Sequence, residues 1–110
     1  MTTLNDPAFF EAAQHLALRI VKEGGPAPSE RIKLGFRLCV ARQPQEREWQ
    51  EMLALWKQQS SRFSQGSHSR EALSIVGDLA WPSGIPVWEE AAWTVVANVL
   101  LNLDETITKN

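Results

Sequence analysis

Tyrosine is absent from this sequence, and cysteine and histidine are nearly so. The 110 residues include one cysteine, Cys39, and two histidines, His15 and His68. A single cysteine cannot form a disulfide within the chain, so packing must hold the fold together. Without a CxxC or CxxCH pattern, these residues lack the spacing of a zinc site or of covalent haem attachment. We therefore expect no metal or cofactor in this chain, with both histidines on the surface and Cys39 packed as a small apolar side chain.

Long apolar runs and a strong net charge are also missing. No stretch approaches the roughly 18 to 20 apolar residues that span a bilayer, so we expect no membrane insertion. Residues 1–6 lack the charged and apolar regions of a signal peptide. The net charge of −2 gives no general attraction to phosphate backbones or anionic lipid. A nucleic-acid role would therefore need a local basic patch.

The usual catalytic and DNA-binding patterns are not found either. The sequence contains no GxSxG, P-loop, GxGxxG or HExxH pattern, so we assign no catalytic residue. A helix–turn–helix reading of residues 29–63 requires basic side chains on one face of the recognition helix. The basic residues are instead dispersed, and the third segment carries several glutamates. We therefore expect no nucleic-acid partner. The basic residues concerned are Arg31, Lys33, Arg37, Arg42 and Arg47.

Apolar residues recur three and four positions apart in four long segments, and no segment shows sustained strand alternation. The pattern predicts one all-α domain over residues 1–110. We expect a compact bundle of four main helices plus a short helix, with a long loop containing Pro and Gly before the C-terminal helix. Asp6 and Ser29 are the predicted caps of the first two helices. The helices are expected from Pro7 to the glycines at 24–25, from Ser29 to Pro44, from Pro44 to Phe63, at 70–76 and at 87–108.

Three features of this pattern concern packing. Gly35 lies inside the second helix, where glycine costs about 1 kcal/mol relative to alanine. It indicates either a close helix crossing or a tolerated weak spot. The final segment, 87–108, has no Gly or Pro and a wide apolar face, so we expect it to be the central helix. Residues 77–86 are unusually apolar for a loop and are expected to lie pinned across the helices.

Four residues are candidates for contact with a partner. Asp104 and Glu105 are adjacent carboxylates near a helix C-terminus, where the helix dipole favours cations. One interpretation is that they contact an Arg or Lys, either on a partner or within this chain, where Arg37 and Arg42 are the candidates. The other is that they form a solvated helix end. Trp81 and Trp88 lie in or beside the apolar loop and are candidates for exposure once the domain is separated from its neighbours.

Three stretches together resemble the C-terminal part of the planctomycete PSD1 proteins, also called DUF1553. They are the opening "LNDPAFFEAA" at 4–13, the middle "RIKLGFRLC" at 31–39 with Arg42, Pro44 and Glu48, and "AAWTVVANVLLNLDE" at 91–105. The last of these is the most specific. The resemblance covers nearly the whole chain except about 64–86. Gln45 stands where the family usually has Thr or Ser, and is a poorer helix cap.

The resemblance implies that this chain is an excised C-terminal module of a larger multidomain protein, with Met1 supplied for expression. Such proteins often carry a cytochrome c-like haem domain upstream and are usually exported, so we expect an exported or periplasmic parent with any haem outside this chain. The family offers no established activity for named residues of this domain.

Two functions remain open at this stage. The first is a non-catalytic structural or interaction module that docks on upstream domains of its parent chain or on another protein. The second is an accessory part of an enzyme or redox site whose main residues lie upstream, to which Asp104, Glu105 and His15 would contribute by converging on a cleft. A helical pocket for a small molecule is a weaker third option, which requires an apolar cavity with convergent polar groups.

Overall fold

The fold consists of helices throughout the part of the chain that the structure describes. The computed structural model describes residues 7–40, 43–77 and 79–108, and for 7–10 and 104–108 it describes the helical backbone alone. Within these ranges there is no strand, so the all-α prediction is confirmed. The elements are α1 (Pro7–Glu23), α2 (Pro28–Val40), α3 (Glu46–Phe63), a 3₁₀ turn η1 (Gly66–His68), α4 (Ser69–Val76) and α5 (Val87–Thr108).

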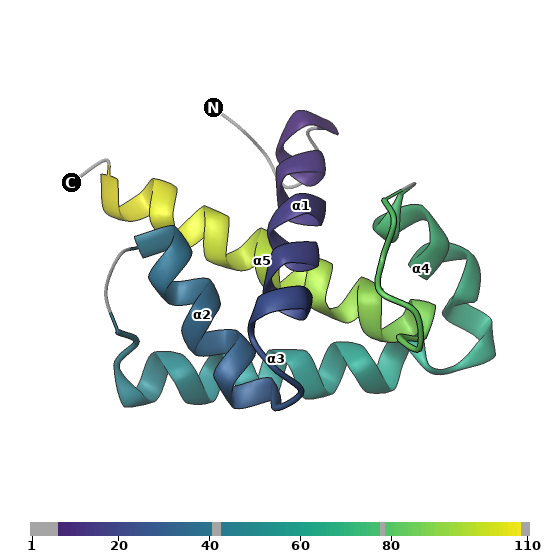
Figure 1. Ribbon diagram of the computed structural model, residues 1–110, viewed down its shortest axis with the longest axis horizontal. Helices are drawn as coiled ribbons and strands as arrows, with labels where there is room; N and C mark the ends of the chain where they lie inside the picture. Colours follow the sequence, from purple (N-terminus) through teal and green to yellow (C-terminus); the bar gives the residue numbers. More distant parts are fainter. Residues whose placement is uncertain (1–6, 41–42, 78, 109–110) are drawn as a thin grey trace.

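Helix α5 is the centre of the molecule, as its apolar pattern predicts. It contacts α1, α2, α3 and α4, and Figure 1 shows it running across the middle of the fold with α1 crossing it and α3 alongside. Its buried residues lie on most sides of the helix, which explains why the apolar stripe is so wide. Small alanines among them allow the neighbouring helices to approach closely. These buried apolar residues are Ala91, Ala92, Trp93, Val96, Ala97 and Leu100.

Gly35 marks a close crossing of α2 with α1 and α5. A Cβ built at this position would lie 2.6 Å from Cδ1 of Leu100 and 3.0 Å from Cδ1 of Ile20. Both neighbours are fully buried. Of the two readings of Gly35, the structure therefore supports the close crossing, because any larger side chain would have to displace core atoms.

The helix ends agree with the sequence except in local details. Gly25 adopts φ 79° after α1, a left-handed conformation that ends a helix at little cost for glycine. The predicted cap at Ser29 is wrong, because α2 begins at Pro28 and the Arg31 N–H donates to Ala27 O at 3.2 Å. Proline suits the first helical position since it has no N–H to leave unpaired. The predicted cap Asp6 lies outside the described residues.

At the start of α3 a side chain compensates for the weak cap. The Gln45 N–H donates to the Glu48 carboxylate at 2.9 Å. This is one half of a capping box, in which a residue in the first turn reaches back to the cap position.

The segment 79–86 lies across the helices, as predicted from its apolar residues. Gly77 ends α4 with φ 67°, and Gly84 within the segment has φ 88°. Glycine tolerates positive φ at both positions because it has no Cβ. Ile85 packs against the larger cluster of buried residues, which lies among α1, α2, α3 and α5. Trp81 packs against this main cluster and also against a second, smaller one formed by α3, α4 and α5. The segment therefore helps to join the two clusters.

Candidate interaction surface

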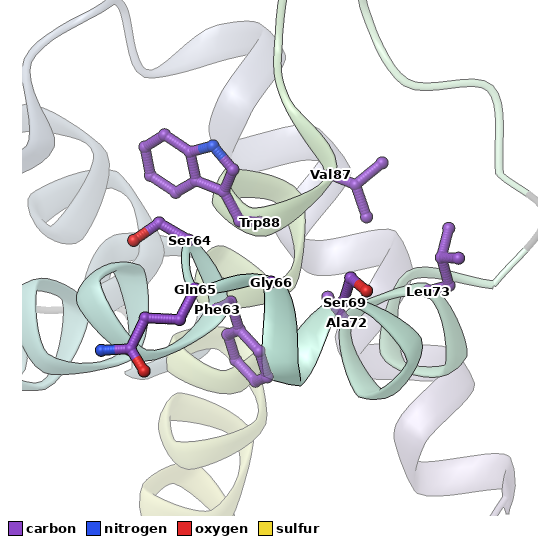
Figure 2. Close-up of a pocket in the computed structure, with 9 residues that line it drawn as sticks. All are labelled: Phe63, Ser64, Gln65, Gly66, Ser69, Ala72, Leu73, Val87 and Trp88. Atoms are coloured by element: carbon purple, nitrogen blue, oxygen red, sulfur yellow. The ribbon is translucent and has the colours of Figure 1, made fainter.

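An apolar groove opens beside the smaller cluster, between the end of α3, the η1 turn, α4 and the first turn of α5 (Figure 2). Its volume is about 290 Å³. Its surface is mainly apolar, with a few uncharged polar residues. The lining residues are Phe63, Ser64, Gln65, Gly66, Ser69, Ala72, Leu73, Val87 and Trp88.

Local sequence positions each wall of the groove. Phe63 ends α3 with a buried ring, and the η1 turn then reverses the chain into α4. Ser69, Ala72 and Leu73 lie three and four positions apart, so they share one face of α4. Pro86 immediately precedes α5 and brings Val87 and Trp88 to the opposite side of the groove.

Two large apolar side chains of the groove remain exposed. Leu73 is 59% exposed and Val87 is 38% exposed. Trp88 is partly buried and packs against the smaller cluster. Leu73 of α4 and Val87 of α5 thus form an exposed apolar edge of a groove that Trp88 also lines, which is the arrangement expected of a contact surface rather than of isolated exposed residues.

Two of the polar side chains that line the groove, Ser64 and Gln65, do not point into its interior. The Ser64 hydroxyl donates to Ser61 O of its own helix at 2.9 Å. Figure 2 shows the Gln65 amide directed away from Leu73 and Val87. A specific small-molecule site usually combines an apolar cavity with convergent polar groups. The groove has the first property, whereas these two groups do not supply the second, so its geometry favours apolar side chains as occupants.

Ion pairs connect the two helices that flank the groove. The Arg62 guanidinium donates to both carboxylate oxygens of Glu71, at 2.9 and 3.0 Å. It also lies 5.4 Å from the centroid of the Phe63 ring. His68 Nδ1 lies 3.5 Å from the Glu71 carboxylate. The exposed Arg62–Glu71 pair links the end of α3 to α4, although such surface pairs are individually weak.

Arg31, in the first turns of α2, is a buried charged residue that lies against α5. Arg31 Nε donates to Gly25 O at 2.7 Å, and its guanidinium lies 5.5 Å from the Trp93 ring centroid. Burial lowers the pKa of Arg31, and the negative charge of Glu89 opposes that shift. Arg31 therefore fixes the turn between α1 and α2 to the central helix. It is one of the basic residues weighed for DNA contact, and the structure gives it this internal role.

Glu90, in the first turn of α5, is also buried. Burial raises the pKa of its carboxyl group, and the neighbouring negative charge of Glu89 raises it further. Sequence patterns did not single out this residue, since a glutamate in the first turn of a helix is ordinary.

Two of the four predicted contact residues have described side chains. Trp88 lines the groove, whereas Trp81 is half-buried between the two clusters. Asp104 and Glu105 belong to the last turns of α5, where the structure describes the backbone but not the side chains. Arg42 lies outside the described residues. Leu73 was missed because an eight-residue helix offers too few positions to show which apolar residue stays exposed.

The described residues contain no group of three or more His, Cys, Asp or Glu side chains that could hold a metal ion. His15 is exposed and Cys39 is half-buried. No helix in the described ranges is long and apolar enough to cross a membrane.

A family model described as "PSD1: Protein of unknown function (DUF1553)" matches residues 1–56. The match includes the first two of the three stretches that resemble the family, and it covers α1, α2 and the first part of α3. The groove and the final motif at 91–105 follow the matched range. No curated protein and no solved structure is similar enough to the chain to count as a match.

Proposed function

The chain belongs to the PSD1 family of proteins of unknown function (DUF1553), and we propose that it is a non-catalytic docking domain of a larger protein. The observation that carries this proposal is the apolar groove, which Trp88 lines and which has the exposed side chains of Leu73 and Val87 at its edge. Exposed apolar side chains that cluster in a depression are typical of protein contact sites.

The composition and size of the groove support a protein segment as the occupant. Tryptophan is enriched among the residues that contribute most to protein–protein binding, and such residues gather at the centre of an interface. At about 290 Å³ the groove lies at the small end of the range of about 300–1,000 Å³ typical of ligand pockets. It therefore suits a small number of apolar side chains better than a large cofactor.

The occupant in this proposal is the upstream part of the same parent protein. The parent is an exported protein in this proposal, and any haem it carries is bound by an upstream domain. These points rest on the family resemblance.

The proposal can be tested by isothermal titration calorimetry. The experiment measures binding between this domain and the separately expressed upstream part of its parent protein. Leu73→Glu places a charge at the apolar edge of the groove, and because Leu73 is largely exposed the fold should tolerate it. We expect Leu73→Glu to weaken binding by about tenfold or more, which corresponds to roughly 1.4 kcal/mol. The double variant Leu73→Glu, Val87→Glu should weaken it further.

Ala54→Glu is the matched control, because Ala54 is an exposed residue of α3 that does not line the groove. It should bind like the unmodified domain. If the unmodified domain shows no association at micromolar concentrations, the proposed occupant is wrong. If Leu73→Glu and Ala54→Glu bind equally well, the groove is not the docking surface.

A further inference from the structure

We draw no further inference here: the strongest candidate, the apolar groove between the end of α3, α4 and the first turn of α5, already carries the proposed function, and nothing in the structure shows what covers it.

Discussion

The guanidinium of Arg31 joins three parts of the chain: the turn after α1, the start of α2 and the face of α5. It donates to Gly25 O and lies over the Trp93 ring. Arginine suits this position because its planar group can stack on an aromatic ring while an N–H donates in the plane. A lysine could keep the positive charge but could not reproduce both contacts.

Arg31→Lys is therefore expected to lower the free energy of unfolding by about 1–3 kcal/mol, since hydrogen bonds that involve charged groups contribute about this much. Urea denaturation followed by circular dichroism measures the change. Arg37→Lys is the control, because Arg37 is exposed on the same helix and should change stability by no more than about 0.5 kcal/mol. Equal effects of the two substitutions would show that the contacts of Arg31 contribute nothing specific.

Glu90 makes stability depend on pH. Its pKa is raised in the folded state by burial and by Glu89. Between the ordinary carboxyl pKa and the raised one, the folded protein therefore holds a proton that the unfolded chain has released. The contribution of Glu90 to stability therefore falls as the pH rises through this window, because at this group the folded state binds more protons than the unfolded state.

We accordingly expect Glu90→Gln to be more stable than the unmodified protein at pH 7, and the difference to shrink as the pH falls towards the ordinary carboxyl value. Thermal denaturation between pH 4 and pH 7 measures both. Glu11→Gln, at an exposed position of α1, corrects for the loss of one negative charge. A Glu90→Gln variant that is less stable than the control at pH 7 would contradict this and would indicate a stabilising partner for the carboxylate.

At the scale of the elements, the crossing of α1, α2 and α5 depends on the absence of a side chain at Gly35. Leu100 of α5 and Ile20 of α1 occupy the space that a Cβ would need. Both contacts involve the ends of flexible side chains, but both side chains are fully buried and have little room to move.

Gly35→Ala is expected to destabilise the fold by about 1 kcal/mol net. Overpacking costs about 1–3 kcal/mol, and the better helix propensity of alanine recovers about 1 kcal/mol of this. Chemical denaturation checks the result. Gly66→Ala is the matched control, since nothing lies within 4 Å of a Cβ at Gly66. A Gly35→Ala variant that is more stable than the unmodified protein would show that the crossing relaxes without cost.

At the scale of the whole molecule, two buried clusters share one central helix. The main cluster and the smaller α4 cluster both include residues of α5, and Trp56 and Trp81 pack against both. Gln14 of α1 also donates to Ile75 O of α4 at 2.8 Å. These connections make separate unfolding of the α4 region unfavourable.

We therefore expect a single cooperative unfolding transition, as is usual for domains of this size. Tryptophan fluorescence and far-ultraviolet circular dichroism should give coincident urea curves, because tryptophans contribute to both clusters. Two separated transitions would contradict this, and would indicate that the α4 region unfolds independently of the main cluster.

The helices and their approximate limits could be predicted from local information in the sequence. Apolar spacing indicates which face of a helix is buried, and the Gly24-Gly25-Pro26 sequence indicates where α1 ends, because both signals act over a few neighbouring residues. The same reasoning identified α5 as the central helix, since it is apolar on so many sides. The small error at Ser29 concerns one residue of a helix start.

The candidate groove could be identified only from the tertiary structure. Leu73 and Val87 lie on different helices, and the packing of α4 against the start of α5 brings them to one surface. The same holds for Gly35, where the sequence left two readings and the distances to Ile20 and Leu100 decided between them. Arg31 likewise looked like any surface cation until α5 was placed against it. Local patterns thus determined which segments form helices, whereas long-range packing decided which side chains remain exposed, because exposure depends on neighbours far away in the sequence.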